Sequence, residues 1–236
     1  MKHAAAARAA QARDDCADCR KGRIAAIIRM ESGITMARTV IPIYFDYASA
    51  LCYVAWRIVG ELRGELDFDP LWKGVPIRMR DGRTRPGNRL GAIEKMKIAT
   101  VIAETGVAVT PLESWIDSQA ALEGSELARA AGRFDAYHDA VFRAVFEQRR
   151  DISDAAALGE IAAAAGLDRE KFVAGVSAGA MRSRLEEYRR EADSFSALGY
   201  PAFVLGDYPL TGIQPKETMR LVLARYLARR SAEPLN

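Results

Sequence analysis

The apolar pattern along the chain changes its period near residue 50. Residues 39–47, TVIPIYFDY, are rich in β-branched and aromatic side chains, which predicts a buried strand. Residues 50–66 follow with apolar side chains at 51, 54, 55, 58, 59 and 62, a stripe typical of one helix face. Residues 67–77, DFDPLWKGVPI, predict a second strand that Pro70 interrupts. The order so far is strand, helix, strand.

A block of helical patterns fills the middle of the chain after a polar loop at residues 78–89. Ser114 followed by Asp117 has the form of a capping box, while Ser153 and Asp168 suit N-caps. The predicted helices are 89–106, 115–131, 134–148, 153–166, 168–176 and 180–199.

Strand signals return late in the chain. Residues 201–212 predict two short strands about a Gly-Asp turn, and 214–230 predict a final helix with Pro215 at its first position. Two strands alone are marginally stable, so the strands at both ends should pair in one sheet. We therefore expect an α/β domain, β-α-β then β-β-α, with an all-helical insertion. The predicted parts are 38–77 and 200–232 for the domain, 78–199 for the insertion, and 1–37 for an extension.

The extension is rich in Ala and Arg and lacks a sustained apolar period, so we expect it to be disordered or loosely helical. It contains Cys16 and Cys19, a C-x-x-C spacing found in redox pairs and in halves of zinc sites. A structural zinc ion takes about four ligands, and the chain has no second such pair. The role of these two cysteines stays open, and we expect no metal.

Composition narrows the function classes. Of the net charge of +3, residues 1–40 carry +4, from eight basic and four acidic side chains, so the rest carries −1. A basic stripe for nucleic acid and a phosphate-binding loop for a nucleotide are both missing. No apolar run approaches the roughly 18 residues of a membrane helix. Three cysteines suit a reducing compartment, so we expect a cytoplasmic protein.

The candidate chemistry lies where the first strand meets the first helix. Ser49 stands three residues before Cys52. A helix N-terminus presents unpaired N–H groups and partial positive charge, which stabilise a sulfur anion. Ser49 can cap this helix, donate a hydrogen bond to a bound thiolate, or do both. Cys52 is either a buried apolar residue or a redox thiol, and it cannot form a disulfide with a serine.

Three segments resemble the DsbA-like thioredoxin-fold superfamily. YFDYASALCYVA resembles its active-site segment D-x-x-C-P-W-C-Y, and GYPAFVLGDYPLTGIQP resembles its G-V-P-x-F-V…G-A-Q-P segment. VFRAVFEQRRDISDAAALGEIAAAAGLD resembles the insertion helices of the cytoplasmic FrnE-like branch. The resemblance covers about 39–230 and implies a thioredoxin fold. It places Ser49 at the attacking cysteine and Cys52 at the resolving one, with Ala50-Leu51 in place of Pro-Trp.

Relatives with serine at the first position are kappa-class glutathione transferases and 2-hydroxychromene-2-carboxylate isomerases, in which that serine contacts the glutathione sulfur. The resemblance also implies that Tyr200-Pro201 is a cis peptide whose strand edge pairs with a cysteinyl peptide or glutathione. Gln214 stands where glutathione-binding relatives carry a Ser-Asp pair; it could bind the γ-glutamyl end with less charge complementarity.

Three functions follow from these residues and the resemblance. The first is a thiol oxidoreductase with a Ser-x-x-Cys site that acts on glutathione or small thiols. The second is a glutathione-dependent transferase or isomerase, and the third is a non-catalytic binding module. Trp56, Trp72 and Trp115 read as core aromatics, and His138 as a surface or core residue. Neither nucleic acid nor membrane is an expected partner, and homodimer formation stays open.

Overall fold

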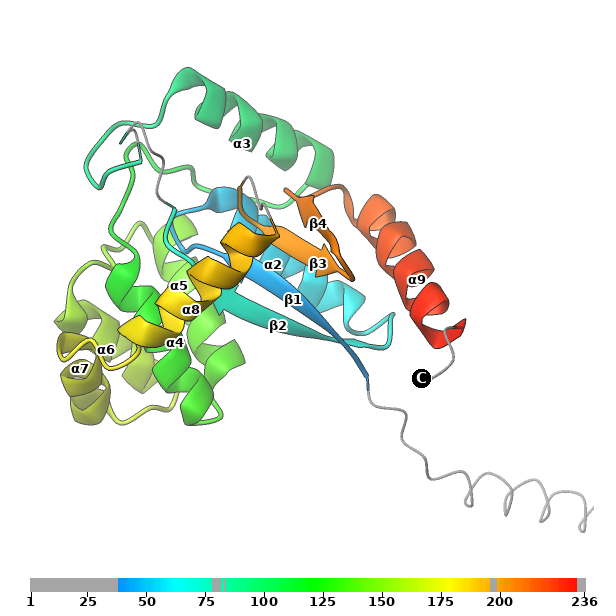
Figure 1. The fold of residues 1–236 in the computed structure, drawn as a ribbon. Coiled ribbons are helices and arrows are strands. Elements are labelled where there is room, and N and C mark those ends of the chain that lie inside the picture. Colours follow the sequence, from blue (N-terminus) through cyan, green and yellow to red (C-terminus); the bar gives the residue numbers. More distant parts are fainter. Residues whose placement is uncertain (1–37, 78–81, 83, 196–198, 233–236) are drawn as a thin grey trace, which may run out of the picture. The chain divides into compact units, whose positions relative to one another are not determined.

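Four strands from the two ends of the folded part form one sheet. The computed structural model describes residues 38–77, 82, 84–195 and 199–232. The strand order is β2 (Phe68–Gly74), β1 (Thr39–Phe45), β3 (Ala202–Leu205) and β4 (Tyr208–Thr211) (Figure 1). β1 and β2 run parallel, whereas β3 is antiparallel to both β1 and β4. The predicted fold class, a thioredoxin fold whose sheet contains strands from both ends of the folded part, is confirmed.

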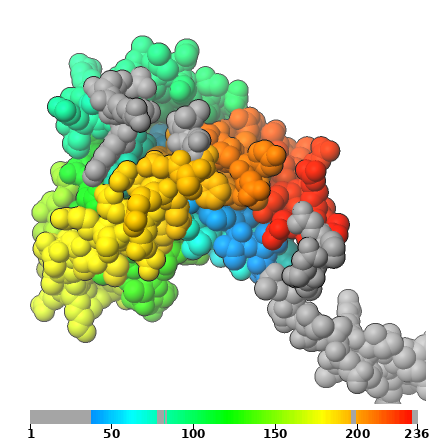
Figure 2. Space-filling view, in the orientation of Figure 1, coloured from blue at the N-terminus to red at the C-terminus, as the bar shows by residue number. Residues whose placement is uncertain are grey.

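Helices cover both faces of the sheet, because β1 alternates its buried side chains between them. Ile41, Ile43 and Phe45 lie in the same core as α2 (Ala50–Leu62) and α9 (Lys216–Ala232). Tyr44 faces the other way and packs with residues of α8 (Arg182–Ser194). In the space-filling view α8 (yellow) leaves the first residues of β1 (blue) visible, and the Val40 side chain is 53% exposed (Figure 2).

The predicted interruption of the second strand at Pro70 is wrong. β2 is continuous from Phe68 to Gly74, and Pro70 pairs with Ile41 of β1. Proline cannot donate a hydrogen bond to a neighbouring strand, but β2 is an edge strand and leaves one side unpaired. The ring is therefore tolerated there.

The predicted helical block is present between β2 and β3. It consists of α3 (Ala92–Thr105), α4 (Gln119–Ala130), α5 (Phe134–Phe146), α6 (Ala155–Ala164), α7 (Arg169–Ser177) and α8. The contacts group the described residues from Thr39 onward as one compact unit. The boundaries expected between domain and insertion stay a prediction. The extension, with Cys16 and Cys19, lies outside the described residues.

Several predicted helix starts lie a few residues from the observed ones, and two of them involve a predicted capping residue. α4 begins at Gln119 rather than at the residue after Ser114, because Trp115 exchanges backbone hydrogen bonds with residues Gly87 and Asn88. Asp154, not Ser153, caps α6 by accepting from the Ala157 N–H at 2.9 Å. A carboxylate at the N-cap also interacts favourably with the helix dipole. The predicted cap of α7 by Asp168 is confirmed.

Buried aromatic rings form the centre of the unit. Trp72 and Trp56 are buried as predicted, whereas Trp115 is only partly buried. His138 is a core residue with no exposed surface, and its Nδ1 lies 2.9 Å from the Tyr47 hydroxyl. Within the described part of the chain, none of the helices combines the length and apolarity that crossing a membrane requires.

Candidate active site

Ser49 occupies the N-cap of α2, at the junction that the sequence singles out. Its backbone is extended, with φ −101° and ψ 114°, and its hydroxyl accepts from the Cys52 N–H at 3.3 Å. The Ser49 carbonyl accepts from Cys52 and Tyr53, which starts the helical hydrogen-bond pattern. The Ser49 N–H donates to the Asp46 carbonyl at 3.1 Å, so the chain turns sharply between β1 and α2. Capping by Ser49 is therefore observed.

The second candidate segment lies directly beside this cap. The Ser49 hydroxyl donates to the Tyr200 carbonyl at 3.5 Å, and the Tyr200-Pro201 peptide is cis as predicted. The Pro201 carbonyl accepts from the Gly212 N–H at 2.7 Å. Gln214 is an exposed residue two positions beyond that glycine. The structure thus brings Ser49, Tyr200 and Pro201 together, with Gln214 following the segment that pairs with Pro201.

Cys52 is enclosed on every side. The residue has no exposed surface, and burial raises the pKa of its thiol to about 12. The Ser49 hydroxyl and the Asp46 backbone N–H favour the thiolate, but they only partly offset the cost of burial. At neutral pH Cys52 is therefore a protonated thiol without access to solvent. A reactive cysteine needs the opposite setting, partial exposure and a lowered pKa.

Asp46 is a site residue that our sequence analysis did not single out. Its carboxylate is 1% exposed and accepts hydrogen bonds from the backbone N–H groups of Ala48, at 2.8 Å, and Ile77. Burial raises its carboxyl pKa, and hydrogen bonds from Ala48, Ser118 and Ile77 oppose the rise. Asp46 thereby joins the ends of β1 and β2 to the start of α4. Its position in the D-x-x-C-like segment, three residues before Ser49, is the signal that could have found it.

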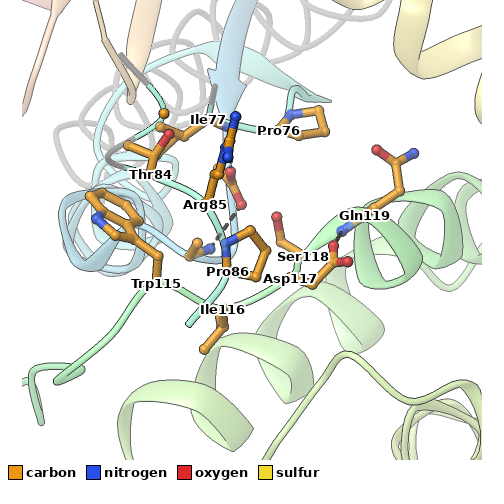
Figure 3. A pocket seen from close by; sticks show the side chains of 13 residues that line it. Pro76, Ile77, Thr84, Arg85, Pro86, Trp115, Ile116, Asp117, Ser118 and Gln119 are labelled. Carbon is orange, nitrogen blue, oxygen red and sulfur yellow. Dashed lines mark hydrogen bonds between the residues drawn. The ribbon is translucent and has the colours of Figure 1, made fainter. Parts of the chain in front are cut away.

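A pocket of about 430 Å³ opens next to the Ser49 turn (Figure 3). Ala48, the residue before Ser49, lines it together with Asp46. The rest of the wall comes from the segment after β2 and from residues 115–119, which lead into α4. A neighbouring pocket of similar volume shares Trp115 and Ile116 as lining residues.

Among the described residues, no group of three or more His, Cys, Asp or Glu side chains could hold a metal ion. What the site does present is a helix N-terminus, one hydroxyl at its tip, a cis-proline segment beside it, and an adjacent pocket. These groups suit the binding of an anionic sulfur atom.

Comparisons with known proteins agree with the observed fold. Residues 40–224 match a family model described as the DSBA-like thioredoxin domain. A probable DsbA oxidoreductase from Streptomyces coelicolor has a similar structure, with TM-score 0.66 and 26% identity over 84% of this chain and 92% of that one. No curated protein sequence matches the chain.

Two further structures show the same fold at lower identity. A 2-hydroxychromene-2-carboxylate isomerase has TM-score 0.66 and 20% identity, covering 82% of this chain and 98% of its own. The cytosolic disulfide reductase DsbM from Pseudomonas aeruginosa, in a structure with GSH, has TM-score 0.61 and 19% identity, covering 80% of this chain and 99% of its own.

Proposed function

This chain belongs to the DSBA-like thioredoxin domain family, and we propose that it binds a small thiol at Ser49 and uses it in a non-redox reaction. Glutathione is the first candidate, because the similar DsbM structure contains GSH. The reaction class is that of a glutathione-dependent transferase or isomerase, in which the bound thiolate is the nucleophile.

The position of the Ser49 hydroxyl supports this proposal. It lies at the N-terminus of a 13-residue helix whose first turn holds no acidic side chain. The partial positive charge of a helix N-terminus favours an anionic ligand. The hydrogen bond from the Ser49 hydroxyl to the Tyr200 carbonyl is long, at 3.5 Å, and therefore weak. Turning the hydroxyl from that carbonyl to a thiolate exchanges a weak bond for a stronger, charge-assisted one.

The burial of Cys52 is the observation that favours a non-redox reaction over thiol exchange. A thiol with a pKa of about 12 and no exposed surface supplies no thiolate near neutral pH. The sulfur anion must then come from the substrate, which is how a transferase or isomerase works. Bound in front of Pro201, a cysteinyl peptide or glutathione can pair its backbone with the Tyr200 segment that precedes this proline, while Gln214 is available for the γ-glutamyl end.

A thiol oxidoreductase with Cys52 as its reactive thiol is the second candidate. One observation favours it: the Ser49 hydroxyl and the Asp46 N–H both stabilise the Cys52 thiolate. It requires the thiol to become exposed during the reaction.

A Cys52→Ser variant separates the candidates, because transferase or isomerase activity survives the substitution and thiol exchange does not. A binding module without turnover would show neither activity. The cytoplasmic location and the homodimer stay predictions.

Calorimetric titration with glutathione tests thiol binding directly. We expect Ser49→Ala to weaken binding at least tenfold and Ser49→Thr, which keeps the hydroxyl, to restore most of it. Asp154→Ala is the matched control, because it removes an N-cap hydrogen bond from a different helix, α6. Equal binding by wild type and Ser49→Ala would refute the proposal, as would the absence of binding by either.

A further inference from the structure

The pocket that neighbours the one in Figure 3 is built from residues that lie between β2 and β3 in the chain. Its volume of about 430 Å³ lies within the ~300–1,000 Å³ usual for small-molecule sites. Residues 86 and 87, residues of 111–117 and the segment after α5 form its wall. None of the described residues that line it is Ser49, Tyr200 or Pro201. This pocket, which we call the Arg149 pocket after a residue of its wall, is therefore a candidate site apart from the thiol site.

One part of the wall is apolar and rigid. Its members are Pro86, Pro111, Leu112, Trp115 and Ile116. Leu112, Trp115 and Ile116 pack against the main core but are only partly buried, so the fold leaves some of their apolar surface uncovered. An indole ring and two proline rings have fixed shapes, and an apolar ligand can pack on them without ordering flexible side chains.

The wall also carries five charged side chains, and four of them already have a partner. These pairs are Glu113 with Lys95, Asp117 with the Gln119 N–H, Asp151 with the Ser153 N–H, and Arg150 with Glu160. The fifth is Arg149, whose guanidinium forms neither a hydrogen bond nor an ion pair with any described residue. Lys95 lowers the pKa of the Glu113 carboxyl, and Arg89 and Arg149 add to the effect, so the Arg149 charge acts on the wall.

The backbone of Arg149 is unusual as well. Among the described residues it is the one non-glycine residue with a positive φ, 55°, a conformation that favours glycine. The N–H of the next residue, Arg150, donates to the Ala144 carbonyl of α5 at 2.8 Å, so the end of the helix holds the chain in this conformation. An arginine thus occupies a position where glycine would be less strained. Strain of this kind is concentrated at functional positions.

We propose that the Arg149 pocket binds a small amphipathic carboxylate, with its apolar body against Leu112 and Trp115 and its carboxylate on the Arg149 guanidinium. A guanidinium can donate two parallel hydrogen bonds to a carboxylate, which gives direction as well as attraction. The three acidic side chains of the wall disfavour a ligand with several negative charges, so one carboxylate fits best. This assignment goes beyond the proposed function, because it does not depend on a reaction at Ser49.

Two probes with the same apolar body test the assignment. They are 4-phenylbutyrate and its uncharged amide, 4-phenylbutyramide, each titrated calorimetrically into the full-length protein. We expect saturable binding of the carboxylate, at least tenfold tighter than binding of the amide. Trp115→Ala should weaken the binding of both probes, because it removes apolar wall. Equal affinity for the two probes, no saturable binding of the carboxylate, or unchanged binding by Trp115→Ala would overturn the proposal.

Two adjacent arginines provide the matched comparison. Arg149→Gln should weaken carboxylate binding at least tenfold and remove the preference over the amide. Arg150→Gln is the control, because that guanidinium is already bonded to Glu160, and it should weaken binding less than threefold. Equal losses in the two variants would show only a general attraction to positive charge and would overturn the proposal.

Arg149→Gly separates ligand binding from stability. Glycine adopts a positive φ without strain, so the urea midpoint of this variant should be equal to or higher than that of the wild type. Its carboxylate binding should nevertheless be as weak as that of Arg149→Gln. Carboxylate binding by Arg149→Gly at the wild-type affinity would overturn the proposal.

Competition with glutathione separates this site from the thiol site. We expect saturating glutathione and the Ser49→Ala substitution each to leave carboxylate binding unchanged. Displacement of the carboxylate by glutathione would overturn the proposal, because the probe would then occupy the thiol site. If glutathione binds to no form of the protein while the carboxylate binds through Arg149, the thiol function fails and the Arg149 site is supported.

Discussion

The Ser49 hydroxyl lies 3.5 Å from the Tyr200 carbonyl oxygen, although 151 positions separate the two residues in the chain. The contact exists because β3 pairs with β1, with Tyr44 opposite Ala202. That register places the start of β3 beside the turn at the end of β1. The helix cap and the cis-proline segment are therefore brought together by the sheet itself and need no contribution from the insertion.

Replacing Ser49 by alanine should destabilise the protein modestly, apart from any effect on ligand binding. The hydroxyl accepts a hydrogen bond from the Cys52 N–H. Without the hydroxyl, this N–H keeps its hydrogen bond to the Ser49 carbonyl. Removal of an N-cap typically costs about 1 kcal/mol of unfolding free energy. Urea unfolding followed by circular dichroism measures the change. A loss above about 3 kcal/mol would show that Ser49 does more than cap the helix.

Cys52 should react with thiol reagents only when the protein unfolds. We expect Cys16→Ser/Cys19→Ser protein, in which Cys52 is the remaining cysteine, to react with Ellman's reagent at least a hundredfold more slowly when folded than in guanidinium. Urea unfolding tests whether the double substitution alters stability. Rapid labelling of the folded protein at neutral pH would contradict the burial and would favour the oxidoreductase candidate.

The same burial predicts an alkaline loss of stability. The folded state holds the Cys52 proton up to a pKa of about 12, whereas an unfolded cysteine loses it near pH 9. Between these values the folded state binds more protons, so its stability falls as the pH rises. The contribution reaches ~1.4 kcal/mol per pH unit. Between pH 9 and 10.5, Cys52→Ala should remove this part of the slope of unfolding free energy against pH, as measured by urea unfolding. An unchanged slope would contradict the prediction.

His138 should make the protein sensitive to acid. Burial, helped by the positive charge of Arg129, lowers the pKa of its imidazole well below the usual 6.5. Below that pH the unfolded chain takes up a proton that the folded state does not, so stability falls as the pH falls. We expect His138→Phe, although its core is altered, to show a weaker pH dependence of unfolding free energy between pH 6.5 and 5. A slope equal to that of the wild type would indicate that His138 is charged in the fold.

Much of the fold could be predicted from the sequence, because apolar periodicity reports directly on which side chains are buried. The run of β-branched and aromatic residues at 39–47 and the helical stripe from 51 to 62 both correspond to observed elements. The cis peptide at Pro201 could be predicted only from a family resemblance, since the local sequence alone favours trans. The start of α4 could not be predicted, because backbone pairing with residues 87 and 88 overrides a plausible capping sequence.

The candidate site was less predictable, because it depends on contacts between distant segments. Ser49 could be identified from its place at a helix tip. Asp46 reads locally as a polar residue that ends a strand, and its role depends on Ile77 and Ser118 reaching it in the fold. The enclosure of Cys52 likewise depends on tertiary packing, so the sequence left a buried and a reactive thiol as open alternatives.

Asp46 provides the last prediction, which tests whether its carboxyl group holds the ends of β1 and β2 together beside the pocket. One carboxyl oxygen accepts from Ala48 and the other from Ile77, so the group uses two acceptors at once. Asparagine has nearly the same shape but only one acceptor oxygen, and its NH₂ group would face an N–H donor. We expect Asp46→Asn to lower the unfolding free energy by about 1–3 kcal/mol, the cost of leaving a buried donor unsatisfied. Hydrogen exchange should accelerate at the Ala48 or Ile77 amide while the amides in the middle of α2 stay protected. Asp154→Asn is the control, because asparagine is also a good N-cap and one oxygen of that carboxylate accepts the Ala157 N–H. If the two variants are equally stable, the Asp46 carboxyl group does not hold the ends of β1 and β2 together.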